Sequence, residues 1–294
     1  MKYAIAALAL LAGCSDYGLQ PPTTLSDIST VRGDIDIVVY ADTSDSMQDQ
    51  IDALSENFIR VISRLEQAQS DWHLIVVTGP EGGSTTGVLS AESADWETSF
   101  TVGINTPPES DVADEWGLFN VQAALEQSDA GELNEGFLRE DAHLHLVFIS
   151  DEPDSSPGSE DGGTYWQAYV DGYLGRKGDP NEVKLSAVGG PAPIGCAFTD
   201  FSAGYYDAVM ATGGDFLSIC EDWPAQLEAL ADTSVTQLSF TLSDEPVGDS
   251  LQVFIDGLER SSGWSYIETR NAVDFQESPP YAGQEVEIRY DIAG

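Results

Sequence analysis

Positive charge is scarce in this sequence of 294 residues. It has 11 lysines and arginines against 51 aspartates and glutamates, which gives a formal net charge of −40. A surface this acidic repels the phosphates of nucleic acids and anionic lipid headgroups. The balance therefore argues against nucleic-acid binding and favours cations, basic partners or a salty medium. Aromatic residues make up 10% and hydrophobic residues 41% of the chain, a composition typical of a folded protein rather than a disordered acidic one.

Sequence signatures of membrane spans and of common enzymes are missing too. No stretch approaches 18 consecutive apolar residues, so none is predicted to be a spanning helix. No serine lies in a Gly-x-Ser-x-Gly motif, and no glycine-rich phosphate loop follows the first expected strand. His143 and His145 share one face of a strand without a third metal ligand, which argues against a zinc site. We therefore expect a non-enzymatic protein.

The first 13 residues are typical of an export signal. Lys2 is followed by an apolar run from Ala4 to Ala12 that ends in small residues. Leu11-Ala12-Gly13-Cys14 resembles the lipobox of bacterial lipoproteins, which implies cleavage before Cys14 and lipidation of its thiol. Ser15 next to it implies transport to the outer membrane, with the protein facing the periplasm or the cell surface. The alternative is an ordinary signal peptide with a chance cysteine.

Cysteine is rare as well, with three in the chain: Cys14, Cys196 and Cys220. If Cys14 carries lipid, an even pair remains in an oxidising compartment. This arithmetic predicts a disulfide between Cys196 and Cys220. Two free buried thiols and a metal-binding pair are the alternatives.

Composition and periodicity divide the rest of the chain into three segments. Residues 14–33 are polar, contain Pro21-Pro22, and are expected to form a tether. Residues 34–233 alternate apolar strands with helices, which predicts an α/β domain with a mostly parallel sheet covered on both faces. Within it, residues 90–112 are expected to be irregular. Residues 235–294 contain short alternating strands and turns, which predict a small β-sandwich-like domain.

The most informative polar segment follows the first expected strand. Asp42, Ser44 and Ser46 alternate through the turn before the next helix, so their oxygens can aim at one point. Ser150 and Asp151 directly follow the apolar strand 144–149. In open α/β sheets, ligands bind beyond the carboxyl ends of the strands. Oxygen ligands at such a place suit a hard divalent cation.

This pattern resembles the metal-ion-dependent adhesion site of von Willebrand factor A (VWA) domains. The resemblance rests on Asp42-x-Ser44-x-Ser46 after one strand and on Ser150-Asp151 after a later one, and it covers about residues 34–233. The whole arrangement also looks like bacterial surface lipoproteins that carry this domain before a small β domain. The resemblance implies a Rossmann-like fold and a bound cation, with Mg²⁺ ahead of Mn²⁺ or Ca²⁺. It also implies that a carboxylate from a partner completes the coordination.

The family's threonine loop has no clear counterpart before the helix expected at 114–127. Thr106 is the first choice, Ser110 the second and Asp111 the third. A carboxylate in that place would make the site more neutral and the ion structural.

Each motif also has a simpler interpretation. The turn at 42–46 can cap the following helix, since Asp and Ser are favoured there. Asp151 can belong to a solvated acidic loop.

The expected function is that of a lipid-anchored binding or adhesion protein. It would recognise a protein or polymer that offers a carboxylate, and it would touch the membrane only through its lipid. One alternative is a structural scaffold of the envelope whose metal only stiffens the fold or is absent. The other is a metal-assisted hydrolase that uses the same carboxylates.

Overall fold

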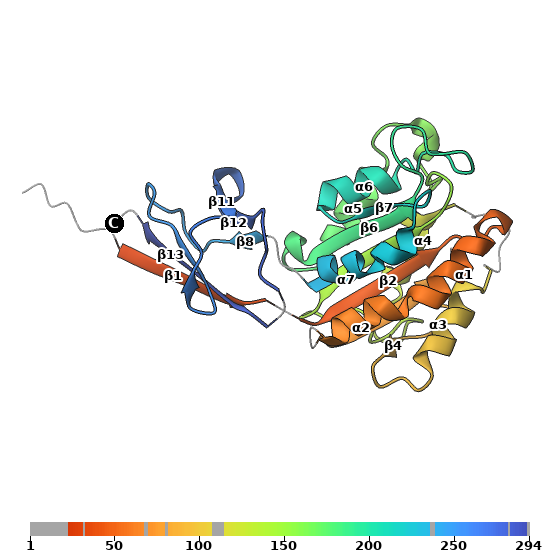
Figure 1. Cartoon of the computed structure of the whole chain (residues 1–294), viewed down its shortest axis with the longest axis horizontal. Coiled ribbons are helices and arrows are strands. Elements are labelled where there is room, and N and C mark those ends of the chain that lie inside the picture. Colours follow the sequence, from red (N-terminus) through yellow and green to blue (C-terminus); the bar gives the residue numbers. More distant parts are fainter. Residues whose placement is uncertain are drawn as a thin grey trace, which may run out of the picture.

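The computed structural model describes residues 23–31, 33–67, 70–79, 82–107, 115–235, 239–281 and 283–292. The expected signal peptide, Cys14 and the first part of the tether lie outside these ranges. Figure 1 shows two parts, an α/β layered part and a smaller part built from strands. None of the helices within the described ranges is long and apolar enough to cross a membrane.

A six-stranded sheet forms the centre of the α/β part. Its strands are β2 (Ile35–Ala41), β3 (Trp72–Val77), β4 (Leu89–Ser90), β5 (His143–Ile149), β6 (Val183–Gly189) and β7 (Phe216–Ser218). Their order across the sheet is β4-β3-β2-β5-β6-β7, and all neighbours are parallel except β4, which pairs antiparallel with β3. Strands β2 and β5 are buried along their whole length because helices cover both faces.

Seven α-helices flank this sheet. They are α1 (Gln48–Asn57), α2 (Ile59–Gln67), α3 (Trp96–Ile104), α4 (Gly117–Glu126), α5 (Trp166–Leu174), α6 (Tyr205–Thr212) and α7 (Leu227–Val235). Side chains of α1, α2, α3 and α7 pack with one face of the sheet, and those of α4, α5 and α6 pack with the other. The predicted α/β class with a mostly parallel sheet is therefore confirmed.

Two local expectations differ from the structure. Residues 90–112, expected to be irregular, contain α3, because the Phe100 ring stacks on Phe58 with centroids 4.3 Å apart and Ile104 is buried in the same core. The helical spacing of apolar residues from Gln48 to Gln67 predicts one helix, and the structure divides this stretch in two at Phe58. For α3, tertiary packing outweighs the local pattern of residues.

The smaller part has two antiparallel sheets around its own core. Its strands are β1 (Thr23–Thr30), β8 (Ser239–Thr241), β9 (Gln252–Ile255), β10 (Leu258–Glu259), β11 (Trp264–Ile267), β12 (Ala272–Phe275) and β13 (Glu285–Ile292). They are arranged as β1-β13-β9-β10 and β11-β12-β8. Val253, Val273 and Ile288 are among the buried residues between the two sheets. This is a sandwich of two small sheets.

Strand β1 corrects the expectation that residues 14–33 form only a tether. It pairs antiparallel with β13 over eight residues, from Thr23 opposite Ile292 to Thr30 opposite Glu285. Asp27 fixes this strand further, because its carboxylate accepts hydrogen bonds from Ser243 and from the Tyr290 hydroxyl at 2.7 Å. The α/β part is thus inserted between the first and second strands of the sandwich.

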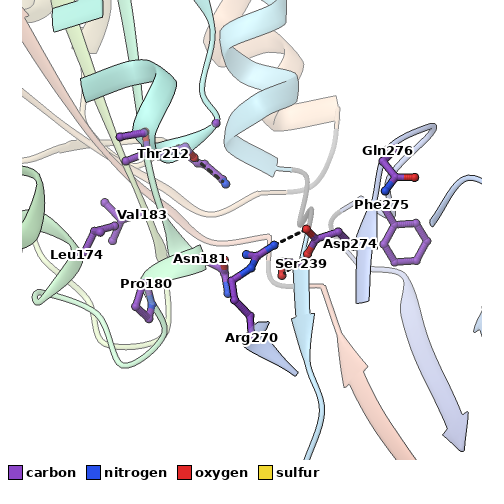
Figure 2. Close-up of a pocket in the computed structure, with 13 residues that line it drawn as sticks. Leu174, Pro180, Asn181, Val183, Thr212, Ser239, Arg270, Asp274, Phe275 and Gln276 are labelled. Atoms are coloured by element: carbon purple, nitrogen blue, oxygen red, sulfur yellow. Dashed lines mark hydrogen bonds and ion pairs between the residues drawn. The ribbon is translucent and has the colours of Figure 1, made fainter. Parts of the chain in front are cut away.

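A cavity of about 370 Å³ lies where the two parts meet (Figure 2). The Lys184 ammonium on its wall donates to the Thr212 carbonyl at 3.1 Å, at the end of α6. Arg270 forms an ion pair with Asp274, which also accepts a hydrogen bond from Ser239. The charged groups facing this cavity are therefore engaged with the protein itself.

Candidate metal centre

The candidate centre lies at the point where the order of the parallel strands reverses. From β2 the chain goes to β3 on one side, whereas β5 pairs with the other side of β2. Asp42 follows the last residue of β2, and Asp151 comes two residues after β5. Because β2 and β5 are adjacent and parallel, both carboxylates lie at the same edge of the sheet, where α/β proteins bind ligands.

The turn from Asp42 to Met47 is organised by Asp42. One of its carboxylate oxygens accepts the Ser44 backbone N–H at 2.9 Å, and the other accepts the Ser150 hydroxyl at 2.8 Å. Asp42 is buried, while Ser44 is half-buried and Ser46 is exposed. Burial raises the pKa of Asp42, and the hydrogen bonds from Ser44 and Ser150 act in the opposite direction. The turn thus presents two hydroxyls outward above a buried carboxylate.

The two serine hydroxyls and Asp151 lie next to one another. Ser44 Oγ and Ser46 Oγ are 3.1 Å apart, and Ser46 Oγ donates to Asp151 Oδ1 at 3.4 Å. In an octahedral Mg²⁺ site with ligands at 2.0–2.1 Å, neighbouring oxygens are separated by about 2.9 Å. The observed separations are close to this spacing, so the residues present fit a hard cation.

Hydroxyl oxygens are essential to this donor set. Within the described ranges, no group of three or more His, Cys, Asp or Glu side chains converges as a metal site would require. A cation bound here would therefore depend on Ser44 and Ser46 beside the two aspartates. Such a mixed set neutralises less charge than a cage of carboxylates does.

Thr106, the first choice for the third loop, lies just after the end of α3. Its hydroxyl donates to the Val102 carbonyl of that helix at 2.8 Å. The neighbouring Asn105 accepts a hydrogen bond of 3.4 Å from Gln48, so the end of α3 does lie beside the start of α1. Ser110 and Asp111 lie outside the described residues.

Asp154 is a buried residue in the acidic segment that follows β5. Its Oδ1 accepts the Leu118 backbone N–H at 3.0 Å and the Ser156 hydroxyl at 2.8 Å. Asp154 therefore satisfies the N-terminus of α4. The sequence signal for this capping role is an aspartate followed two residues later by a serine, since Asp and Ser are typical capping residues.

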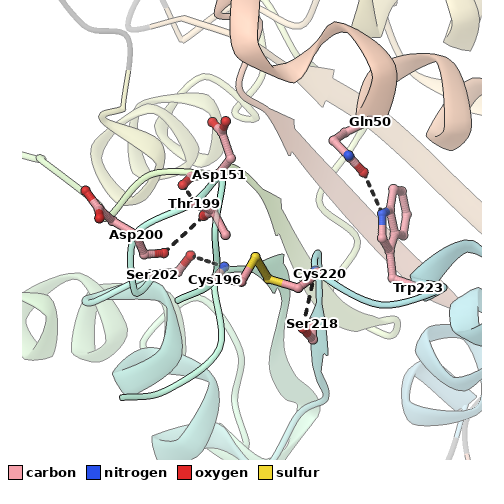
Figure 3. Close-up of a disulfide and its surroundings, with 10 residues drawn as sticks. Gln50, Asp151, Cys196, Thr199, Asp200, Ser202, Ser218, Cys220 and Trp223 are labelled. Atoms are coloured by element: carbon pink, nitrogen blue, oxygen red, sulfur yellow. Dashed lines mark hydrogen bonds between the residues drawn. A yellow bond between two sulfur atoms is a disulfide. The ribbon is translucent and has the colours of Figure 1, made fainter. Parts of the chain in front are cut away.

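The predicted disulfide between Cys196 and Cys220 is present (Figure 3). It joins the segment after β6 to the segment after β7. Thr199, three residues after Cys196, donates its hydroxyl to the Asp151 carbonyl. The disulfide therefore secures a segment that directly holds the backbone of a candidate metal ligand.

Removal of this disulfide should lower the free energy of unfolding by about 3 kcal/mol. The bond closes a loop with a sequence separation of 24 residues, and the stabilisation follows from the restricted unfolded chain. Urea unfolding of Cys196→Ser/Cys220→Ser, compared with the oxidised and the reduced parent, measures the difference. Equal midpoints for all three proteins would contradict this expectation.

Comparison with known proteins finds no matching family model and no matching curated protein. Similar solved structures include a von Willebrand factor type A protein from Catenulispora acidiphila, with 12% identity over 92% of this chain and a TM-score of 0.45. The pilus adhesin SpaC from Lactobacillus rhamnosus GG, in its open conformation, has 14% identity over 92% of this chain and a TM-score of 0.40. Proximal thread matrix protein 1 from the mussel byssus has 15% identity over 71% of this chain and a TM-score of 0.40. The chain spans 65%, 41% and 48% of these three proteins, respectively.

Proposed function

We propose that this chain is a non-enzymatic, lipid-anchored binding protein of the bacterial cell envelope. Its centre at Asp42, Ser44, Ser46 and Asp151 holds a divalent cation, Mg²⁺ before Mn²⁺ or Ca²⁺. The cation recognises an acidic group on a protein or polymer partner. The single observation that carries this proposal is the convergence of two hydroxyls and two carboxylates, from two separate strand ends, at the switch point of the sheet.

Each of the four residues has a distinct part in this binding. When bound, the cation supplies a positive centre that attracts a carboxylate. Ser44 and Ser46 offer neutral oxygens on the outer side of the turn, so little of that charge is neutralised. Asp42 is buried and fixes the turn through Ser44 and Ser150. Asp151 supplies a carboxylate oxygen beside Ser46.

The lipobox-like segment supports the proposed anchor. Lipidation at Cys14 would place the mature chain on the outer membrane, facing the periplasm or the cell surface, with no other membrane contact. The cysteine arithmetic agrees with this, because Cys196 and Cys220 pair with each other and export to an oxidising compartment favours such a bond.

A structural scaffold is the second candidate, and one observation favours it. Both oxygens of Asp42 already accept hydrogen bonds, and Ser46 already donates to Asp151. A site closed by its own hydrogen bonds suits an ion that only stiffens the fold. In that case the melting temperature responds to metal while partner binding does not.

Divalent cation should stabilise a soluble form of the protein that starts at residue 20 and so retains β1. A cation at a hundredfold excess over its Kd adds about 2.7 kcal/mol, which raises the melting temperature by several degrees. Ser44→Ala/Ser46→Ala removes the two hydroxyl ligands and should abolish this shift. Calorimetric titration with Mg²⁺, Mn²⁺ and Ca²⁺ at moderate salt gives the stoichiometry, with one site expected.

The matched control is Ser261→Ala/Ser262→Ala, which removes two exposed hydroxyls from the β part. It should behave as the parent does. Equal and salt-sensitive shifts in all three proteins would mean that the metal binds only as a diffuse counter-ion to the acidic surface. A screen of ester, peptide and phosphate substrates, expected to be silent, tests the absence of hydrolysis.

A further inference from the structure

Two large apolar side chains are exposed on the segment that touches Asp151. Ile194 retains 81% and Phe198 60% of its accessible surface. Both belong to residues 190–199, here called the clamped loop, which follows β6 and contains Cys196. Single exposed apolar residues are ordinary, whereas apolar side chains gathered on one surface feature mark interaction sites.

The clamped loop is held in place by several independent contacts. The disulfide ties Cys196 to Cys220, and the Cys196 backbone N–H donates to the Thr199 carbonyl at 3.0 Å. The Gly195 N–H donates to the Pro191 carbonyl at 2.7 Å. An added Cβ at Gly190 would lie 1.7 Å from the Asp200 carbonyl oxygen, so the two ends of the loop are in close contact. Ile194 and Phe198 are therefore presented by a restrained backbone, which reduces the entropy lost on binding.

The clamped loop borders the candidate metal centre. The Thr199 hydroxyl donates to the Asp151 backbone carbonyl (Figure 3). The Asp151 side chain accepts the hydrogen bond from Ser46. One residue thus joins the loop to the metal centre. A partner whose carboxylate reaches the cation would meet this loop beside it.

The distribution of charge around this loop favours an acidic partner. Residues 185–199 contain no Asp, Glu, Lys or Arg, in a chain with 51 acidic residues. An acidic partner is repelled by most of such a surface. The clamped loop offers it an uncharged, apolar surface next to the place where the cation would be bound.

We propose that the clamped loop is a docking surface for a protein segment that carries an aspartate or glutamate next to large apolar side chains. Ile194 and Phe198 contact the apolar side chains while the carboxylate reaches the metal centre. This proposal rests on the proposed function, since it names the class of partner for that same site.

The test uses a library of random peptides displayed on phage and selected with Mg²⁺ on the soluble form described above. The enriched peptides should combine an acidic residue with neighbouring aromatic or aliphatic residues. A synthetic copy of the most enriched peptide should bind at least about tenfold more weakly to Ile194→Ser/Phe198→Ser, because both side chains are lost from the contact. Ser44→Ala/Ser46→Ala should also lose binding, as should the parent in a chelator.

The matched control is Leu133→Ser/Leu258→Ser, which removes two comparably exposed apolar side chains elsewhere. This variant should bind the peptide as the parent does. All variants should keep the parent's melting temperature without metal, which excludes loss of folding as the cause.

The remaining outcomes separate the two proposals. Acidic peptides bound equally by the parent and by Ile194→Ser/Phe198→Ser would overturn the loop's role and leave the metal site standing. Peptides that need Ile194 and Phe198, but neither metal nor the serines, would overturn the proposed function and the metal-linked partner. Enrichment of no peptide at all would overturn both.

Discussion

Replacing Asp36 with Asn should lower the free energy of unfolding by about 3–5 kcal/mol, because it leaves the buried ammonium of Lys177 without its ion-pair partner. Asp36 is the second residue of β2, and its side chain is fully buried. Its Oδ1 accepts Arg139 Nε at 2.8 Å, and its Oδ2 accepts the Arg139 backbone N–H at 2.7 Å. The ammonium of Lys177, itself almost fully buried, is 3.5 Å from Oδ2.

The burial of this cluster explains the size of the expected effect. Burial raises the pKa of Asp36, although Arg139 and Lys177 pull it downward, and burial lowers the pKa of Lys177. The ion pairs therefore only offset the free energy that is lost when these charges are removed from water. In either orientation an asparagine would point its amide NH2 group at a donor that now bonds to Asp36, and urea unfolding at neutral pH would record the loss.

Two further variants show whether charge or shape is responsible. Asp71→Asn removes an exposed partner of the same arginine, 2.9 Å from its guanidinium, and should lower stability by less than about 1 kcal/mol. Asp36→Asn/Lys177→Met also removes the buried ammonium that has lost its partner and should recover about 1 kcal/mol or more. A loss for Asp36→Asn no larger than that for Asp71→Asn would contradict the prediction.

Mild acid should destabilise the protein through His145. This side chain is buried on β5, between the Ser186 hydroxyl at 2.8 Å and the Ser234 hydroxyl. Burial lowers its pKa from 6.5 to about 3, and the charge of Lys184 acts in the same direction. Between these two values the unfolded chain binds a proton that the folded protein excludes. Stability therefore falls as the pH is lowered from 6.5 towards 3.

The expected loss from His145 between pH 7 and pH 4.5 is about 2.5 kcal/mol. His145→Gln removes the titrating ring and should be less stable at pH 7 while lacking this part of the pH dependence. Urea unfolding of both proteins at several pH values isolates the contribution, since the buried carboxylates are common to both. Parallel stability curves would show that His145 is not responsible.

The parallel strands of the α/β part could be predicted because burial on both faces leaves a clear mark on the sequence. Ile35 to Tyr40 and Leu144 to Ile149 are runs of apolar, often β-branched residues. Their order along the chain, with helices between them, then determines the class of fold. The positions of Asp42 and Asp151 followed from the same runs, since each lies just past the end of one.

Strand β1 could not be predicted in the same way. Its sequence is mostly polar because it lies at the edge of its sheet, and most of its side chains are exposed. Its partner β13 is more than 250 residues away in the sequence. No local pattern encodes a pairing over that distance, so the segment resembled a linker.

The partners of buried polar groups were missed for a similar reason. Asp36 interrupts an apolar strand, yet Arg139 and Lys177 come from distant segments that only the fold brings to it. In the sequence, Asp154 cannot be told apart from the acidic residues around it. In the fold, it accepts a hydrogen bond from Leu118 at the start of α4. Sequence patterns identify buried apolar residues well. They identify buried polar residues less well.

The position of β1 in the sandwich has a mechanical consequence. Backbone continuity carries a pull applied upstream of Thr23 along β1 and then β2 to the turn that contains Ser44. Strands β8 to β13 come later in the chain and lie off this path. Because β1 is already extended, its detachment from β13 would release almost no length. Tension applied upstream of Thr23 and resisted at this turn therefore runs through two strands and leaves the rest of the sandwich unloaded.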